Sequence, residues 1–125
     1  MDLPLRLYVR ELPPGLNGPR GLERMHWGAK KRLLERWQLL IRAQLKPPIP
    51  KFVGEVDMVV VRRRRSGPAM DEDNLHATVK VPQDALQKLG VIENDRDVRL
   101  SVTQVVDRER WGTDIIITPR DQSDG

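Results

Sequence analysis

The sequence contains no cysteine. This absence excludes disulfide bonds, thiolate zinc sites, iron–sulfur clusters and cysteine nucleophiles. Histidine is almost as scarce, because His26 and His76 are the two histidines of the chain. A metal centre built from several histidines, or a histidine relay, is therefore not expected.

Long apolar runs are also missing. No stretch approaches the roughly 20 apolar residues of a membrane span, and residues 1–10 lack the apolar run of a signal peptide. The sequence is 38% hydrophobic, enough for one modest core, and 32% charged, so much of the surface has to be ionic. We expect a soluble, cytoplasmic protein of one domain over residues 1–125, with a frayed tail from residue 119.

The net charge of +4 hides an uneven distribution of charge along the chain. Residues 1–70 carry 15 basic and 6 acidic side chains, whereas residues 71–125 carry 7 basic and 12 acidic ones. A basic part and an acidic part within one small domain indicate a polyanionic partner and a localised acidic site.

The spacing of apolar residues predicts four strands and two helices. Alternation with a period of two marks strands, and recurrence every three or four residues marks helices. Pro47, Pro48 and Pro50 should end the first helix, and Pro82 should kink or break the second. In chain order we expect a strand over 3–10, a helix over 27–45, a strand over 52–63, a helix over about 74–89, a strand over 98–103 and a strand over 113–118.

This order, β-α-β-α-β-β, predicts an α+β fold with a four-stranded mixed sheet and two helices packed on one face. Trp27 should share the apolar face of the first helix with Leu34, Ile41 and Leu45. Residues 107–112 should form the turn of a hairpin that joins the last two strands.

Acidic residues are concentrated in one segment, with seven of them within residues 71–97. Asp71 and Asp73 stand at a strand-to-helix junction, where an extended backbone would point both carboxylates into one cavity, and Asp95 follows the second helix. Lys80 belongs to the polar face of that helix, on the same side as Asp73 seven residues earlier and Asp84 four residues later. Carboxylates that hold Mg²⁺ beside a lysine that neutralises phosphate charge are the composition needed for phosphoryl transfer.

The same residues also have simpler interpretations. Asp71 and Asp73 could serve only as helix caps, and Asp95 could be an ordinary turn residue. Lys80 could be a solvated lysine that pairs with Asp84 four residues later. His26, His76 and Asp84 could support the site or belong to the helix surface. The segment is not an EF-hand, because it lacks the glycine and the glutamate of that loop.

Two groups of basic residues could contact phosphates. The first is the run Arg62 to Arg65, in which strand alternation allows no more than two side chains on one face. The second is on the first helix, where Lys30 and Lys31 are followed by Arg32 and Arg36. Such contacts give affinity that depends on salt and not on sequence. With 4% aromatic residues there is little sign of a stacking platform, so duplex or branched nucleic acid fits better than a single strand.

At these residues the chain resembles the RusA-type Holliday-junction resolvases, endonucleases of bacteria and their phages. The resemblance covers roughly residues 5–117, and residues 17–31, with Met25-His26-Trp27, resemble the family's N-terminal region less specifically. Its specific motifs are Asp71-x-Asp73-Asn74-Leu75, Lys80-x-x-x-Asp84-Ala85-Leu86, Gly90-Val91-Ile92 and Asp95.

The resemblance implies a homodimeric, Mg²⁺-dependent enzyme that nicks two opposed strands of a four-way DNA junction, with Mn²⁺ as a possible substitute. Asp71, Asp73 and Asp95 would be the metal ligands, and Lys80 the catalytic lysine. The lysine follows the second aspartate by four residues in some members and by seven here. Asn94-Asp95 stands where the family often has two aspartates.

Two other functions remain open. The chain could be a non-catalytic nucleic-acid-binding protein of prophage origin, which would keep the basic residues without needing the carboxylates. It could also be a nuclease that prefers forks, flaps or plain duplex. The sequence does not separate these substrates, because selectivity for a DNA structure depends on the geometry of the dimer.

Overall fold

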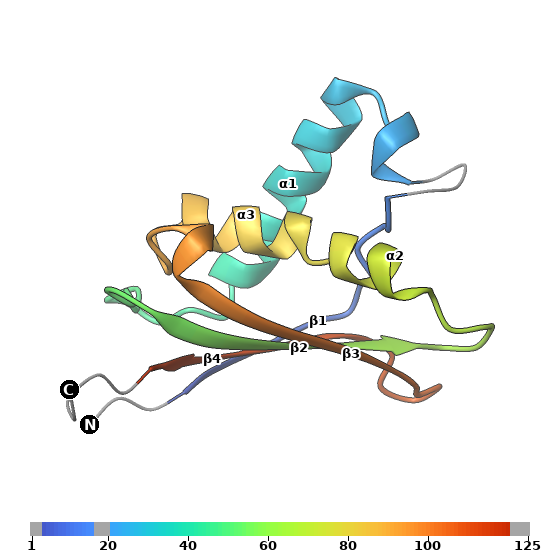
Figure 1. Cartoon of the computed structure of the whole chain (residues 1–125). Helices are drawn as coiled ribbons and strands as arrows, with labels where there is room; N and C mark the ends of the chain where they lie inside the picture. The colour runs from blue at the N-terminus through green and yellow to red at the C-terminus, as the bar shows by residue number, and fades with distance from the viewer. Residues whose placement is uncertain (1–3, 17–20, 121–125) are drawn as a thin grey trace.

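The computed structural model describes residues 4–16 and 21–120, which form one four-stranded sheet with helices on one side of it (Figure 1). The expected α+β architecture is confirmed at this level. The elements are β1 (Leu5–Val9), η1 (Leu22–Arg24), α1 (Trp27–Arg42), β2 (Val56–Arg64), α2 (Glu72–Ala77), α3 (Lys80–Lys88), η2 (Asp95–Asp97), β3 (Val98–Val106) and β4 (Gly112–Pro119).

The strand order in the sheet is β1-β4-β2-β3. β2 pairs in parallel with β3, with α2 and α3 in the connection between them, and β4 pairs antiparallel with both β1 and β2. The predicted hairpin between the last two strands is therefore wrong, because β2 lies between β3 and β4. Residues 107–111 instead cross the carboxyl end of β2, where the Asp107 N–H donates to the Arg64 carbonyl at 2.8 Å.

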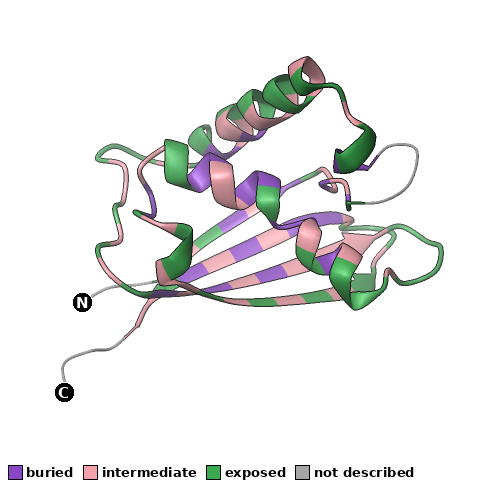
Figure 2. Cartoon of the chain, turned by 45° about the horizontal axis from the view of Figure 1, so that its top comes forward, coloured by how far each residue is buried: buried purple, intermediate pink, exposed green. Residues whose placement is uncertain are grey.

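Alternation along the strands separates a buried face from an open face. Buried and partly exposed residues alternate along β1, β2 and β4 (Figure 2). The buried side packs against Trp37 and Ile41 of α1 and against Ala85 and Leu86 of α3. The helices lie on this side alone (Figure 1), so the opposite face of the sheet is open to solvent. The strand residues of the buried side are Leu7, Val9, Val56, Met58, Val60, Ile115 and Ile117.

The second predicted helix is two helices. α2 ends at Ala77 and α3 begins at Lys80. The break expected at Pro82 falls three to four residues before it, because a proline ring clashes with the carbonyl four residues earlier, here that of Thr78. Pro82 itself sits in the first turn of α3, where its missing N–H costs no helical hydrogen bond.

Three smaller expectations also change. Trp27 lies outside the core, with 72% of its surface exposed, because it is the first residue of α1 at the end that projects farthest from the sheet (Figure 1). Phe52 is not part of β2. It forms a separate bridge with Ile92, since Gly54, with φ +83°, turns the backbone between Phe52 and the strand.

The chain is ordered beyond the expected start of the tail at residue 119. Pro119 is the last residue of β4, and the Arg120 N–H donates to the Glu55 carbonyl at 3.1 Å. The Arg120 side chain pairs with Glu55 and, at 3.4 Å, with Asp57. The rest of the predicted tail, residues 121–125, lies outside the described residues, as does Leu3 of the first predicted strand.

Within the described residues, no helix combines the length and the apolar character that a membrane span requires.

Candidate functional site

Asp71 caps the amino terminus of α2. Its Oδ1 accepts a hydrogen bond from the Asn74 N–H at 2.8 Å, as an N-cap residue does. The preceding residue, Met70, is held by the amide of Gln104 on β3: the Met70 N–H donates to Oε1 at 3.0 Å, and Nε2 donates to the Met70 carbonyl at 2.8 Å. The helical start that bears the aspartates is therefore fixed to the carboxyl-terminal half of β3.

The rest of the D-x-D-N-L motif is partly structural. Leu75 is buried, and the Asn74 Oδ1 accepts a hydrogen bond from the Leu16 N–H at 2.9 Å. Gly15 makes this approach possible, because a Cβ at that position would lie 2.7 Å from the Asn74 Oδ1. The loop over residues 13–16 is thus held against α2 at the side where the aspartates begin.

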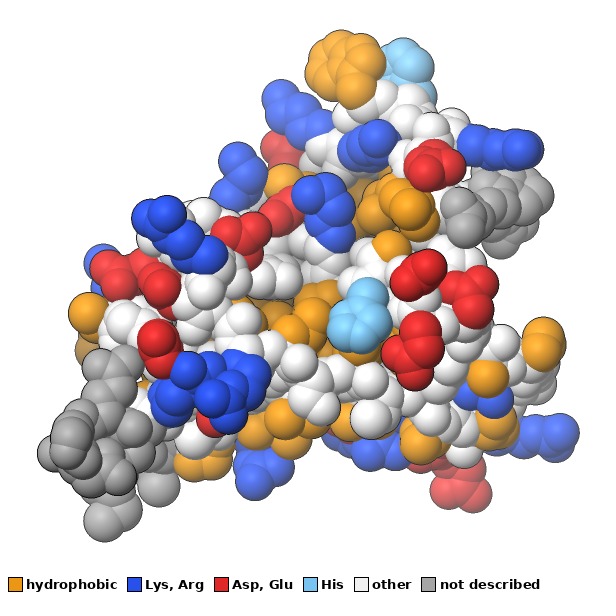
Figure 3. All heavy atoms as spheres, viewed as in Figure 1, with side chains coloured by type: hydrophobic (Ala, Val, Ile, Leu, Met, Phe, Trp, Pro, Cys, Tyr) orange, Lys and Arg blue, Asp and Glu red, His pale blue; other side chains and the backbone are white. Residues whose placement is uncertain are grey.

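Asp73 has no such structural role within the described residues. It is exposed in the first turn of α2, beside Glu72, which pairs with His76 at 3.8 Å. Acidic side chains gather on the surface over α2, next to a histidine (Figure 3). A negative charge in this first turn is favoured by the helix dipole, but it makes no contact that the fold requires.

Lys80 begins α3 and is 70% exposed, with Nζ 3.8 Å from Asp84 Oδ2. The pairing expected of a solvated lysine is therefore present. The sequence-based expectation that Lys80 shares a helical face with Asp73 assumed one continuous helix, and the break before α3 removes that assumption. The lysine is nevertheless free to move, because an exposed pair of this kind contributes only a few tenths of a kcal/mol.

Asp95 lies at the other end of β3 from Asp71. It begins η2, which leads directly into Val98 at the amino end of β3, whereas Gln104 holds the segment of Asp71 near the carboxyl end. The six residue steps from Val98 to Gln104 span about 20 Å of strand. Within residues 4–16 and 21–120, no three histidine or acidic side chains come close enough to hold a metal ion. One chain alone therefore does not bring Asp95 to Asp71 and Asp73.

The four arginines of the basic run divide between the two faces of the sheet, as alternation predicts. Arg62 is partly buried on the helix side and donates to the Pro13 carbonyl at 2.6 Å. Burial and the charge of Arg64 lower the pKa of the Arg62 guanidinium. Arg64 donates to the Gly67 carbonyl at 3.0 Å. These two side chains thus have structural contacts. Arg63 belongs to the open face, and Arg65, just after the end of β2, lies over the Trp111 ring.

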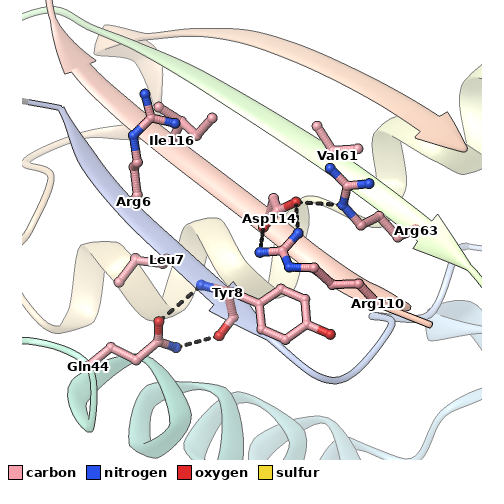
Figure 4. A pocket seen from close by; sticks show the side chains of 9 residues that line it. All are labelled: Arg6, Leu7, Tyr8, Gln44, Val61, Arg63, Arg110, Asp114 and Ile116. Atoms are coloured by element: carbon pink, nitrogen blue, oxygen red, sulfur yellow. Dashed lines mark hydrogen bonds and ion pairs between the residues drawn. The ribbon is translucent and has the colours of Figure 1, made fainter. Parts of the chain in front are cut away.

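Arg63 takes part in a cluster around Asp114 on the open face (Figure 4). The Asp114 carboxylate accepts hydrogen bonds from Arg63 Nε at 2.6 Å and from both terminal nitrogens of Arg110 at 2.8 Å. The hydrogen bonds from Arg110 lower the pKa of the Asp114 carboxyl. Burial opposes this shift and Arg63 adds to it. The hydrogen bonds to Asp114 in turn raise the pKa of Arg110. Arg110 also lies 4.3 Å from the Tyr8 ring centroid.

A second group on this face is built on Trp111. The guanidinium carbons of Arg10 and Arg65 lie 4.7 Å and 5.8 Å from the Trp111 ring centroid. Sequence reasoning missed Arg10 and Trp111, because no periodicity links β1 to the turn before β4. The alternation of β1 does contain part of the signal, since it places Arg6 and Tyr8 opposite to the buried Leu7 and Val9.

The remaining basic pair, Lys30 and Lys31, is exposed in the second turn of α1 and belongs to the helical layer. His26 caps this helix, its Nδ1 accepting from the Gly28 N–H at 3.2 Å. The two basic groups predicted from the sequence are therefore on different layers, and the Arg63–Arg65 pair faces away from α1.

Comparison with models of known protein families finds no match, and a search of curated proteins finds no significant relative.

The Asp114 cluster predicts a pH-dependent contribution to stability. A lowered carboxyl pKa in the folded state stabilises the fold above the ordinary aspartate pKa of 3.8, and this stabilisation is lost as pH falls through the folded pKa. Asp114→Asn should cost about 2 kcal/mol at neutral pH, measured by urea unfolding. The difference from wild type should close at low pH. Asp84→Asn, which removes an exposed pair, should cost only a few tenths of a kcal/mol; equal costs for the two variants would contradict the prediction.

Proposed function

We propose that this protein is a Mg²⁺-dependent, structure-selective DNA endonuclease that resolves four-way junctions by paired symmetric nicks. Its roles would be DNA recombination and repair in the cytoplasm of a bacterial or phage-infected cell. The observation that carries the proposal is the pair Asp71 and Asp73 at an exposed helical start. This helical start follows the carboxyl end of β2 in the sequence, and Arg63 of β2 lies on the open face of the sheet. The motif resemblance to RusA-type resolvases supplies the reaction.

The donor set of this helical start suits a hard cation. Asp71 uses Oδ1 for the helix cap, which leaves Oδ2 available to a cation. Both carboxylate oxygens of Asp73 are available in the same way, since no hydrogen bond to them occurs within the described residues. A Mg²⁺ or Mn²⁺ ion held there would polarise the scissile phosphodiester and lower the pKa of an attacking water. The role of the chain is to hold these oxygens on a rigid helical turn that Met70 and Gln104 fix to β3.

Lys80 would act on the phosphate as a mobile cation. Its 70% exposure and its 3.8 Å pair with Asp84 leave the ammonium able to turn toward a bound phosphate. There it would offset the negative charge that develops as the phosphodiester bond breaks.

The position of Asp95 requires a second copy of the chain if this aspartate is a ligand. We therefore expect a homodimer in which each site combines Asp71 and Asp73 of one chain with Asp95 of the other. The prediction is tested with Asp73→Asn and Asp95→Asn, each inactive alone. Refolding an equal mixture should restore nicking to about a quarter of the sites, because mixed dimers contain one intact site each. If Asp95 acts within its own chain, every mixed site is defective and no activity returns.

The proposal as a whole is tested with a labelled synthetic four-way junction, a fork, a flap and a plain duplex of the same sequences. Purified protein with Mg²⁺ should cut the junction at symmetric positions and prefer it in competition, and Asp73→Asn protein should not cut. Preferred cutting of forks or flaps would correct the substrate. No cutting beyond the Asp73→Asn control would overturn the nuclease proposal.

A second candidate is a non-catalytic nucleic-acid-binding protein. The observation that favours it is the separation of Asp95 from Asp71 and Asp73 within one chain, together with the basic open face. Such a protein would bind the junction without cutting it, and Asp71→Asn and Asp95→Asn would then behave like wild type in both assays.

A further inference from the structure

One end of the open sheet face carries arginines that no acidic residue neutralises. Arg63 and Arg110 are compensated by Asp114. Arg6, Arg10 and Arg65 are exposed, and no acidic partner contacts them in the described part of the chain. Arg10 and Arg65 lie where β2 ends and β4 begins, and Arg6 lies farther along the open face, on β1 opposite Ile116 of β4.

Two of these arginines lie against an aromatic ring. Arg10 and Arg65 both lie over the ring of Trp111, and Arg10 Nη1 also donates to the Glu109 carbonyl at 3.1 Å. Stacking on an aromatic ring restrains a guanidinium plane while its remaining N–H groups stay available for hydrogen bonds. The Trp111 carbonyl accepts a hydrogen bond from the Tyr8 hydroxyl, which ties this turn to β1.

A pocket of about 450 Å³ lies on the same face (Figure 4). Val61 and Ile116 contribute apolar surface to it, and Arg6 on β1 and Arg63 on β2 line it from the two strands that flank β4. Tyr8 and Arg110 also line it and connect it with the Trp111 turn. Arginines around a partly apolar hollow of this size can accept a phosphate together with its sugar.

We propose that the open face of the sheet is the DNA-binding surface, with the Arg10–Trp111–Arg65 stack and Arg6 holding the sugar-phosphate backbone. The inference rests on the proposed function for the identity of the polyanion. A second copy of the chain is a poor occupant of this end of the face, because a two-fold axis passing through it would bring the same uncompensated arginines together. A polyanion removes that repulsion and pairs with each of them.

The surface is also close to the candidate metal ligands along the chain. Asp71 follows Arg65 by six positions, and six residue steps span at most about 20 Å. Arg65 therefore lies within about 20 Å of the start of α2, which bears Asp71 and Asp73 on the helix side of the sheet. Lys30 and Lys31 belong to the helical layer and would contribute little to this contact.

The experiment measures binding of a fluorescent four-way junction by anisotropy, over a series of salt concentrations in EDTA so that no cleavage occurs. Arg10→Gln/Arg65→Gln should raise Kd about tenfold or more and lower the slope of log K against log salt by about 2. Arg10→Lys/Arg65→Lys keeps the charge but loses the planar stack, so it should fall between this variant and wild type. Lys46→Gln/Lys88→Gln, which removes two exposed charges beyond the end of α1 and at the end of α3, should bind like wild type.

Each outcome separates the inference from the proposed function. If the Arg10/Arg65 variant binds like wild type while Lys30→Gln/Lys31→Gln loses affinity, the open-face surface is wrong and the nuclease proposal is untouched. If wild-type protein does not bind the junction at any salt concentration, both fail. Thermal denaturation of each variant confirms that it remains folded, and Trp111→Phe, which keeps an aromatic ring at the turn, provides a milder test of the stack.

Discussion

Asp73→Asn is expected to lower the rate of junction cleavage by about 10³-fold or more while leaving the fold intact. A metal-held phosphate gains several kcal/mol of transition-state stabilisation, and each 1.4 kcal/mol corresponds to a factor of ten in rate. Asp73 has no structural contact within the described residues, so its replacement by an isosteric amide should leave the stability almost unchanged. Binding of the junction should be retained or strengthened, since a negative charge near phosphate is removed.

Asp71 offers a comparison that separates its two roles. Asparagine caps a helix about as well as aspartate, so Asp71→Asn should keep the cap and lose only the charge, whereas Asp71→Ala should lose both and cost about 1 kcal/mol. We expect equal loss of cleavage from both variants and loss of stability from the alanine alone.

The matched control for these variants is Glu72→Gln. Glu72 is exposed between the two aspartates and pairs with His76 at 3.8 Å. Cleavage by this variant should stay within about twofold of wild type, since a surface pair contributes little. If Glu72→Gln and Asp73→Asn lower the rate equally, cleavage depends on the local negative charge and not on a specific metal site at Asp73. Rates are measured under single-turnover conditions, with stability checked by urea unfolding.

Gly112→Ala is expected to destabilise the fold by roughly 3 kcal/mol, the largest effect on stability that we predict for a single methyl group. Gly112 begins β4 with φ +142°. A Cβ there would lie 2.6 Å from the Val9 carbonyl and 2.8 Å from the Tyr8 hydroxyl. Because the Val9 oxygen belongs to the backbone of β1, the clash can be relieved only by separating β1 from β4.

Gly67→Ala is the control for this prediction. Gly67 also has a positive φ, of +90°, but a Cβ there would meet nothing within 4 Å. Gly67→Ala should lower the free energy of unfolding by only about 1 kcal/mol, which is the conformational penalty without the clash. Urea unfolding of both variants measures the difference, and equal costs would show that the approach of β1 to Gly112 is not tight. Gly112→Ala should also weaken DNA binding, because it displaces the Tyr8 and Trp111 part of the open face.

The elements themselves were predictable because their signals are local. The alternation of β1, β2 and β4 and the spacing of apolar residues in α1 follow from burial on one side of each element. Pro82 predicts the break between α2 and α3, but not its position before Lys80. The pairing of the strands was not predictable, because the order β1-β4-β2-β3 depends on which apolar faces fit together across the whole chain.

The candidate site divides in the same way. The exposed helical start with Asp71 and Asp73 follows from a D-x-D-N pattern at a strand-to-helix junction. Asp95 was expected to join it, and its distance from Asp71 could not be read from the spacing, because that distance is set by the length and direction of β3. The open-face group was missed for a related reason: Arg10, Arg65 and Trp111 meet only because β4 lies between β1 and β2.

By itself the sequence determined the class of the fold, the split between a basic and an acidic part, and the residue types of a carboxylate site, since these depend on composition and near-neighbour spacing. The tertiary structure decided which arginines share the open face and which are committed to the carbonyls of Pro13 and Gly67. It also decided that one chain separates Asp95 from the other two aspartates. The physical reason is that contacts between distant segments depend on strand order and register, which only the packing of the whole core selects.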